Sequence, residues 1–370
     1  MNKKTYLTAE QIEKRFSVIR TLISVAVALV FCFIMIALSS ENLANDVITF
    51  ITAPVSSLSR FTTFIIKMCP IIFTSCAICL LFQSGVSNLA VEGAFYVAAV
   101  MAAAVGAAQG MPPVIHFVIM ALTGAVSAAA VLLIPAILQV KFNANIVVSS
   151  LMLNYVCTFF ANYLVTGPFR DPGAGYEATY LVADSAKLAK VSLGGGQFHV
   201  GIFIALAAVA LTWFILFKTT FGYQCRTVGA NSRFAHFSGI KVAKVILLSS
   251  IVAGFLTGVG GATEVSGYYA RLNWVASPQY GWDGIMVATL ARNNPIGALA
   301  ASAFLAYIRT SADVLNITSV VPVEIVEIAQ QVIIVMIAAR GLLYSFEKKA
   351  IVKNARKQME SMENHEEVEG

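Results

Sequence analysis

Three acidic residues lie inside apolar stretches of the chain: Glu92 in "NLAVEGAF", Glu264 in "GGATEVSG" and Asp283 in "GWDGIMV". An ionisable side chain inside a membrane span is costly and normally faces the protein interior or a water-filled path. Each acid also lies beside or near glycine, which suits a helix N-terminus, where free N–H groups favour negative charge. Two interpretations stay open: the acids line a polar pathway, or they stabilise the ends of broken helices. A proton relay is less favoured, with Lys67 as the candidate partner.

Two short motifs resemble each other. Asn88-x-x-x-Glu92-Gly93 and Tyr280-x-x-Asp283-Gly284 are acid–glycine pairs in opposite halves of the chain. We expect Glu92 near the inner end of a helix that rises outward, and Asp283 near the outer end of a helix that descends. Such a reversal predicts an inverted repeat, with polar broken helices at the repeat interface. A third polar residue, Asn154 in "SSLMLNYV", lies in mid-helix and requires a hydrogen-bond partner.

The composition sets the class of protein. The 370 residues are 58% hydrophobic and 12% charged, whereas soluble domains are about 45–50% apolar and about 25% charged. The apolar runs are continuous, which indicates transmembrane helices. We therefore expect an all-α polytopic transmembrane bundle of about ten helices, some short or broken. The predicted helices are 19–39, 61–83, 88–109, 113–138, 145–166, 199–217, 245–266, 274–291, 295–312 and 322–343, of which the eighth and ninth are the expected short or broken ones.

The basic residues predict the orientation. With the N-terminus inside, 18 of the 25 Lys and Arg residues fall on the cytoplasmic side and six, including Arg309, fall outside. Cytoplasmic loops carry such an excess, so both termini are expected in the cytoplasm. This distribution also accounts for the net charge of +6 without a nucleic-acid partner.

The segment 218–244 is the main predicted inner loop, with basic residues and no acid. Its "ANSRFAHFS" stretch is about two helical turns long, and Asn231 or Ser232 can cap it. Phe234 and Phe237 then share one face. A short helix of this kind suits docking into a groove of a partner protein, or it lies on the lipid headgroups.

Several chemistries are excluded by the sequence. There is no G-x-x-x-x-G-K-[ST] loop for ATP and no H-E-x-x-H motif, and the four histidines are scattered. Cys76-x-x-Cys79 has no second pair, and buried cysteine behaves as a small hydrophobe. We expect no metal, no cofactor and no enzymatic activity in this chain.

Five stretches carry a resemblance to a known family: "NLAVEGAFYVAAVMAA", "SSLMLNY", "FGYQCRTVGANSRFAHFSGIKVAKVILLSSIVAGFLTGVGGATEVSG", "GWDGIMVATLARNNPIGALAA" and "IRTSADVLN". Together they resemble the permease subunits of ABC importers, and most closely the nucleoside and simple-sugar branch, which is related to the permeases for ribose and branched-chain amino acids. The resemblance runs from Asn88 to Asn316. The region before Gln83 matches no motif of that family.

The resemblance implies a membrane-spanning permease subunit that passes a nucleoside or a related simple sugar across the cell membrane. It implies three protein partners in the lipid bilayer and at its faces: an ABC ATPase subunit that hydrolyses ATP, a homologous second permease forming a heterodimer, and an extracellular substrate-binding (lipo)protein. The expected organisation is a cytoplasmic segment at 1–18, a transmembrane permease domain at 19–345 and a charged cytoplasmic tail at 346–370.

The resemblance also assigns the candidate site residues. The expected ATPase-coupling loop consists of Gly229, Asn231, Arg233, Phe234, Phe237, Gly239 and Ile240. The expected pathway or helix-end polar residues are Asn88, Glu92, Asn154, Glu264 and Asp283. The alternative function is an ion-coupled secondary transporter that needs no ATPase, in which the buried acids would bind H⁺ or Na⁺.

Overall fold

The computed structural model describes residues 43–269, 271–274 and 276–318, together with Ala26, Val30, Ile34 and Ile328. The predicted helices at 19–39 and 322–343 and the predicted tails at 1–18 and 346–370 fall outside the continuous ranges. Contacts divide the chain into two compact units, residues 1–48 with 315–370, and residues 49–314. The described part of the first unit is the start of one helix and the end of another, and the second unit holds the features that follow.

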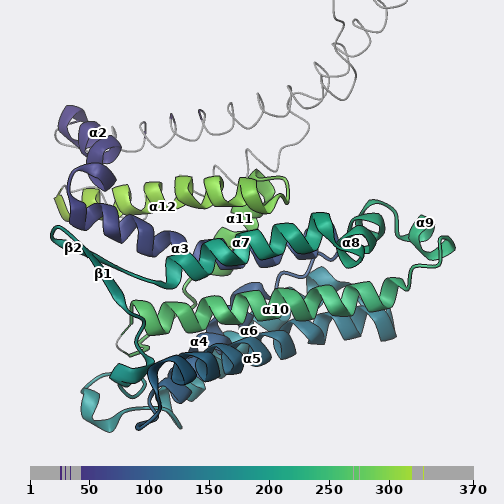
Figure 1. Ribbon diagram of the computed structural model, residues 1–370, viewed down its shortest axis with the longest axis horizontal. Coiled ribbons are helices and arrows are strands. Elements are labelled where there is room, and N and C mark those ends of the chain that lie inside the picture. The colour runs from purple at the N-terminus through teal and green to yellow at the C-terminus, as the bar shows by residue number, and fades with distance from the viewer. Residues whose placement is uncertain are drawn as a thin grey trace, which may run out of the picture. The chain divides into compact units, whose positions relative to one another are not determined.

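The described chain is a helical bundle with one small hairpin (Figure 1). Its elements are α2 (Leu43–Thr52), η1 (Ala53–Val55), α3 (Leu58–Gln83), α4 (Val91–Gly106), α5 (Pro113–Phe142), α6 (Ile146–Thr166), η2 (Pro172–Ala174), η3 (Asp184–Ala186), β1 (Lys190–Leu193), β2 (Gly196–His199), α7 (Gly201–Lys218), α8 (Thr220–Ala230), α9 (Ser232–Phe237), α10 (Val242–Gly267), α11 (Tyr280–Leu290) and α12 (Pro295–Thr318). Six of these, α3, α5, α6, α7, α10 and α12, are long and apolar enough to cross a membrane. The predicted multi-pass helical bundle is confirmed for this part of the chain.

Two apolar helices are too short to span a bilayer alone. Helix α4 has 16 residues and α11 has 11, which is about 24 Å and 16 Å of helix against a hydrocarbon core of about 30 Å. The predicted helix 274–291 therefore starts six residues too early. The reason is local: Pro278 disfavours helical backbone at the residue before it, and Gln279 has a left-handed φ of 66°.

The predicted ninth helix, 295–312, ends too early. Helix α12 continues to Thr318 and carries Arg309 and Asp313 in its interior. The polar residues that suggested a helix end have partners on neighbouring helices, described below. The short helices of the bundle are therefore the third and eighth predicted ones, not the eighth and ninth.

Helix α10 is the central packing element and contacts α5, α4 and α3 (Figure 1). Its Gly254-x-x-x-Gly258 motif faces α5. A Cβ on Gly258 would lie 2.1 Å from the carbonyl oxygen of Gly124, and one on Gly254 would lie 2.3 Å from the Cα of Ala129. The small residues thus permit the close backbone approach that is typical of membrane helices.

The described part of the chain is not purely α-helical. Strands β1 and β2 pair in antiparallel fashion, with Lys190 opposite His199 and Leu193 opposite Gly196. Gly194 and Gly195 connect them with φ values of 46° and 111°, and two-residue hairpin turns of this kind require positive φ. The hairpin lies in a loop that hydropathy leaves unassigned, where "LGGGQ" supplies the turn, and it leaves the predicted helical class of the bundle unchanged.

Candidate functional site

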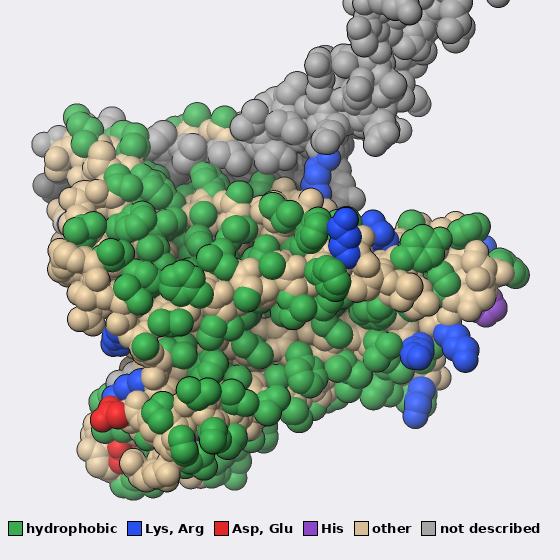
Figure 2. Space-filling view, viewed as in Figure 1, with side chains coloured by type: hydrophobic (Ala, Val, Ile, Leu, Met, Phe, Trp, Pro, Cys, Tyr) green, Lys and Arg blue, Asp and Glu red, His purple; other side chains and the backbone are tan. Residues whose placement is uncertain are grey.

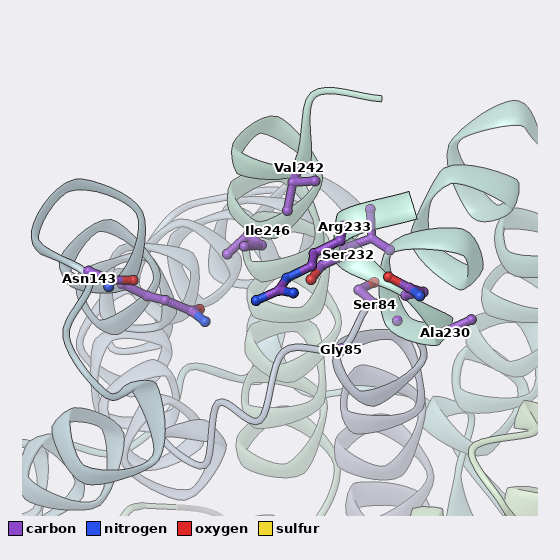
Figure 3. Close-up of a pocket in the computed structure, with 12 residues that line it drawn as sticks. Ser84, Gly85, Asn143, Ala230, Ser232, Arg233, Val242 and Ile246 are labelled. Atoms are coloured by element: carbon purple, nitrogen blue, oxygen red, sulfur yellow. The ribbon is translucent and has the colours of Figure 1, made fainter. Parts of the chain in front are cut away.

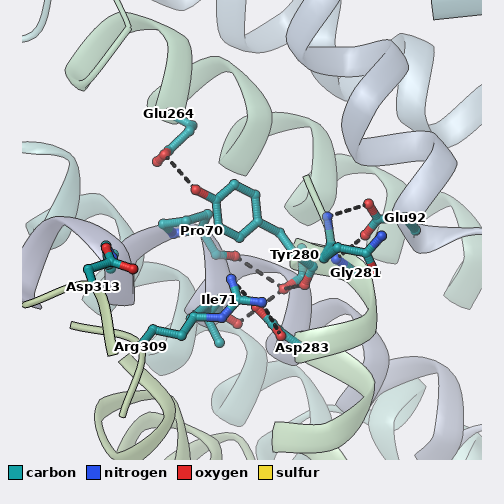
Figure 4. A network of polar contacts seen from close by, with 12 residues as sticks. Pro70, Ile71, Glu92, Glu264, Tyr280, Gly281, Asp283, Arg309 and Asp313 are labelled. Atoms are coloured by element: carbon teal, nitrogen blue, oxygen red, sulfur yellow. Dashed lines mark hydrogen bonds and ion pairs between the residues drawn. The ribbon is translucent and has the colours of Figure 1, made fainter. Parts of the chain in front are cut away.

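The start of α11 is stabilised by a residue from another helix. Helix α11 has no side-chain cap of its own, although the first N–H groups of a helix lack partners within it. The carboxylate of Glu92, in the first turn of α4, accepts hydrogen bonds from the backbone N–H of Gln279 at 2.7 Å and of Gly281 at 2.5 Å. It also accepts one from the hydroxyl of Ser277. Figure 4 shows Glu92 facing Gly281. Glu92 therefore caps α11 from α4.

The start of α4 is held in a similar way by α6. The backbone N–H of Gly93 donates to Oδ1 of Asn154 at 2.9 Å, and Nδ2 of Asn154 donates to the carbonyl of Leu89 at 2.9 Å. Asn88 accepts from the N–H of Ala90 at 3.1 Å and donates to the carbonyl of Leu132 at 2.9 Å. The structure thus places Asn88, Glu92 and Asn154 together, at the point where two short helices begin.

This arrangement corrects the predicted positions of Glu92 and Asp283. If Glu92 lay near the inner end of its helix and Asp283 near the outer end of its own, most of the membrane thickness would separate the two residues. The hydrogen bonds of Glu92 instead bring the N-termini of α4 and α11 together. Hydropathy does not predict this meeting of the two N-termini. Both helices are too short to cross the membrane, but the chain that connects them to their neighbours is also apolar, so the helix starts are not visible in the pattern.

Asp283 has a different partner from Glu92. Its two carboxylate oxygens lie 2.8 Å and 2.7 Å from the NH2 and NH1 groups of Arg309 on α12 (Figure 4). The Asp283 side chain is 5% exposed and that of Arg309 is 22% exposed. Arg309, which the count of basic residues assigned to the outer side, is thus the ionic partner of a buried acid. One turn further along α12, Asp313 pairs with Lys67 of α3.

Glu264 lies near the end of α10 and is only 2% exposed. Its Oε1 accepts a hydrogen bond from the hydroxyl of Tyr280 at 3.2 Å. Its Oε2 has no hydrogen-bond partner among the described residues. Glu264 therefore differs from Glu92, which accepts three hydrogen bonds, and from Asp283, which pairs with Arg309.

The segment α8–α9 carries the predicted coupling residues. Oδ1 of Asn231 accepts from the N–H of Phe234 at 3.0 Å, which confirms Asn231 as the cap of α9. Gly239 ends the helix with a φ of 82°, and the N–H of Ile240 donates to the carbonyl of Ala235 at 3.0 Å. Helix α8 was not predicted, because its glycines interrupt the helical pattern.

Two aromatic side chains of α9 face away from the bundle. Phe234 is 60% exposed and Phe237 is 88% exposed, whereas Ala235 is buried. Ala235 packs with Cys225, Val228 and Val245, which anchors α9 to α8 and α10. Figure 2 shows that Lys and Arg side chains gather at the end of this unit that carries α8 and α9. The segment is therefore a fixed element with an exposed aromatic and basic surface.

A pocket of about 610 Å³ opens beside this segment (Figure 3). The ends of α3 and α5, the α8–α9 junction and the start of α10 surround it. It is lined by Ser84, Gly85, Gln139, Asn143, Val228, Gly229, Ala230, Asn231, Ser232, Arg233, Val242 and Ile246. Arg233 extends from α9 toward the end of α5 that carries Asn143 (Figure 3), so this predicted coupling residue lines the pocket.

Gly229, near the end of α8, packs the α8–α9 segment against the end of α3. A Cβ at this position would lie 2.2 Å from the carbonyl oxygen of Gln83 at the end of α3. Nε2 of Gln83 in turn donates to the carbonyl of Asn293, in the turn between α11 and α12, at 3.3 Å. The chain that follows Gln83 leads directly to Asn88 and Glu92. The α8–α9 segment thus contacts the same part of the chain that precedes the helix junction.

Arg309 and Tyr280 are partly buried residues of the site that the sequence did not assign to it. Arg309 and Asp313 are four residues apart in "IRTSAD", so they share a helix face. That spacing was a usable signal, because two charges on one face of an apolar helix indicate two partners. Tyr280 had no such signal, since aromatic residues are common throughout the chain.

Comparisons with known proteins agree with this architecture. Residues 60–341 match the family described as "Branched-chain amino acid transport system / permease component". The chain is 32% identical to the guanosine ABC transporter permease protein NupP of Bacillus subtilis over 279 residues, covering 74% of this chain and 79% of NupP.

Two further relatives are similar at lower identity. The chain is 27% identical to the glucose ABC transporter permease protein TsgB13 of Haloferax volcanii, covering 75% of each protein. It is 26% identical to the nucleoside ABC transporter permease protein NupB of Lactococcus lactis subsp. cremoris, covering 75% of this chain and 78% of NupB. No solved structure matches significantly. The chain belongs to the family of branched-chain amino acid transport system permease components, and it is a multi-pass membrane permease.

Proposed function

We propose that this chain is the membrane-spanning subunit of an ATP-driven importer that takes up nucleosides, with purine nucleosides as the first candidates. Two of its relatives are named as guanosine and nucleoside permeases. One is named as a glucose permease, and a simple sugar is the second candidate substrate. The proposed orientation has α8 and α9 in the cytoplasm, in agreement with the basic residues at that end.

The observation that carries the proposal is the exposed pair Phe234 and Phe237 on a helix whose other side is anchored. An anchored helix with an apolar outer face fits the groove of a partner protein. In an importer of this type the partner is an ATPase subunit. Asn231, Gly239 and Ile240 fix the two ends of the helix, while Arg233, Phe234 and Phe237 supply the surface.

The mechanism follows from the contacts of Gly229. Closure of the ATPase on ATP displaces α9 and α8, and the close contact with Gln83 transmits the movement to the end of α3. From there the chain runs through Asn88 to Glu92 and the start of α11. A displacement of α8 and α9 thereby changes the junction of the two short helices, which is where the proposed pathway polar residues lie.

The proposed assembly has three further chains: an ATPase subunit below, a second homologous permease beside this one, and a substrate-binding protein outside. ATP is hydrolysed on the ATPase chain. Of the three buried acids, Glu92 is engaged by backbone donors and Asp283 by Arg309. Neither of these two is free to bind a coupling ion, so the ion-coupled alternative depends on Glu264 alone.

The test is uptake of labelled guanosine by cells that lack their own nucleoside import and express the whole transporter. Uptake is expected with all subunits present, and it is expected to disappear when the ATPase chain is omitted. Uptake that continues without the ATPase chain would establish the secondary transporter instead. Uptake of glucose but no nucleoside would keep the importer and change its substrate.

A further inference from the structure

Two buried carboxylate oxygens of the described bundle have no hydrogen-bond partner, Oδ2 of Asp283 and Oε2 of Glu264, and of these Asp283 Oδ2 has Arg309 as an ionic partner. Glu264 is 2% exposed, and its Oε1 receives a single hydrogen bond from Tyr280, while Oε2 has no partner among the described residues. A buried acceptor without a donor is costly. Figure 4 shows Glu264 on the far side of the Tyr280 ring from Glu92 and Asp283, so the donors of the helix junction do not reach it.

Aromatic rings form a continuous series from the surface to this carboxylate. Tyr268, which is 53% exposed, contacts Tyr269 with ring centroids 4.9 Å apart. Tyr269 contacts Trp274 at 5.3 Å, and Trp274 contacts Tyr280 at 6.3 Å. The hydroxyl of Tyr280 then reaches Glu264. Phe95 completes the series against Tyr280 at 5.4 Å.

We propose that Glu264 and these rings recognise the base of a purine nucleoside during transport, with Glu264 as a specificity-determining residue. The inference rests on the proposed nucleoside import. Flat bases stack on aromatic side chains, which explains the ring series. A carboxylate accepts hydrogen bonds and donates none, so it selects a base edge with adjacent donors. Guanine presents two such donors, N1–H and N2–H₂, in one plane.

The choice of a base over a sugar follows from this geometry. The series of rings leads to one carboxylate, and the two in-plane donors of guanine match its two oxygens in the manner of other bidentate pairs. Adenine presents an acceptor at N1 beside the donor at N6, and the carboxylate has no donor to offer it. Guanosine is therefore the preferred purine nucleoside, followed by inosine, which keeps N1–H and lacks the N2 amine.

The test is the variant Glu264→Gln in the complete transporter. A glutamine offers one donor and one acceptor, and this is the pattern that pairs with adenine. Uptake of labelled guanosine, inosine and adenosine is measured in cells with the wild-type or the variant permease. The binding protein is the same in both cells, so the variant-to-wild-type ratio for each nucleoside reports on the permease.

The expected result is a guanosine ratio that falls about tenfold or more, a smaller fall for inosine, and an adenosine ratio that is unchanged or raised. Equal falls for all three nucleosides would assign Glu264 a structural role and overturn the inference, as would three unchanged ratios. A wild-type transporter that takes up only glucose would overturn both this inference and the proposed nucleoside import.

Two controls keep the test decisive. Immunoblots of the membrane fraction compare the amount of variant and wild-type protein. If Glu264→Gln does not insert, Glu264→Asp replaces it, because this change keeps the charge and withdraws the carboxylate by one methylene. It is expected to lower guanosine uptake while guanosine remains preferred over adenosine. An unchanged guanosine uptake with full insertion would contradict the proposal.

Discussion

The carboxylate of Glu92 lies 2.5 Å from the backbone nitrogen of Gly281, although 189 residues separate them in the sequence. There is no space for a side chain between them, because a Cβ on Gly281 would lie 2.4 Å from the backbone nitrogen of Glu92. Helix α11 therefore depends on α4, because a side chain in the first turn of α4 provides the cap of α11.

The first prediction concerns this cap. Glu92→Gln removes the charge and turns an amide group toward backbone donors, so it is expected to lower the free energy of unfolding by about 1–3 kcal/mol and to reduce transport. Thermal unfolding in detergent and nucleoside uptake measure the two effects. The exposed Glu177 provides the control, since Glu177→Gln removes the same charge at the surface. Equal melting temperatures for the two variants would contradict the capping role.

The second prediction concerns the ion pair between Asp283 and Arg309. Asp283→Asn leaves a buried guanidinium without its counter-charge, and loss of one partner of such a pair costs about 3–5 kcal/mol. The double variant Asp283→Asn with Arg309→Gln is expected to regain much of that stability. Melting temperatures of the two single variants and the double variant form a mutant cycle. Additive losses would show that the two side chains do not interact energetically.

A third prediction addresses docking. Phe237→Ala, Phe234→Ala and Arg233→Glu change exposed side chains, so the melting temperature is expected to stay close to that of the wild type. Binding of the ATPase subunit and uptake are expected to be lost or strongly reduced. Affinity purification through a tag on the permease measures ATPase recovery. Phe214→Ala on α7 is the control, because Phe214 is also exposed, at 54%, and does not belong to α8 or α9. Full recovery of the ATPase with all three variants would refute the docking surface.

The fourth prediction concerns transmission through Gly229. Gly229→Ala places a methyl group 2.2 Å from the carbonyl oxygen of Gln83, so the end of α8 must move away from α3. Transport is expected to fall while the ATPase still binds, because the surface of α9 is unchanged. Gly297 in α12 is the matched control, since a Cβ there meets atoms at 3.4 Å or more. Normal transport by Gly229→Ala would exclude this contact as the route of coupling.

The fifth prediction is a pH dependence. Burial, together with the charge of nearby Lys190, lowers the pKa of His199 to about 4, compared with about 6.5 in the unfolded chain. Between these values the unfolded state binds more protons, so stability rises with pH from about 4 to 6.5 and is lost as the pH falls. The free energy of unfolding is expected to be about 2 kcal/mol lower at pH 5 than at pH 7 from this residue.

Melting temperatures of the wild type and of His199→Gln at pH 5, 6 and 7 measure this contribution. Other titrating groups affect both proteins equally, so the difference between the two curves belongs to His199. The variant is expected to show the smaller decrease toward pH 5. Parallel curves would mean that His199 is protonated as easily in the folded protein as in the unfolded chain.

Hydropathy and turn signals predict much of this fold. The long helices α3, α5, α6, α7, α10 and α12 are found because each is a continuous apolar run. Pro295 is confirmed as the first residue of α12, and Asn294 caps it by accepting from the N–H of Ile296 at 3.0 Å. Asn231, one of two predicted caps of α9, is also confirmed. Caps can be predicted from sequence because the donor lies only two or three residues away along the chain.

The sequence does not predict contacts between distant segments. Residues 268–279 connect α10 to α11, yet they contain Tyr268, Tyr269 and Trp274, so no change of polarity marks the helix start. A count of basic residues likewise cannot show that Asp283, from another helix, is the ionic partner of Arg309. The capping of α11 by Glu92 depends on the packing of α4, α6 and α11, which only the tertiary structure provides.

The meeting of α4 and α11 at one carboxylate has an electrical consequence. Each helix N-terminus carries about half a positive elementary charge, so two together are matched by the single negative charge of Glu92. The junction is close to neutral as a whole, whereas two uncompensated N-termini would attract anions and repel cations. The single carboxylate of Glu92 thus removes the net field that the two N-termini would otherwise impose on their surroundings.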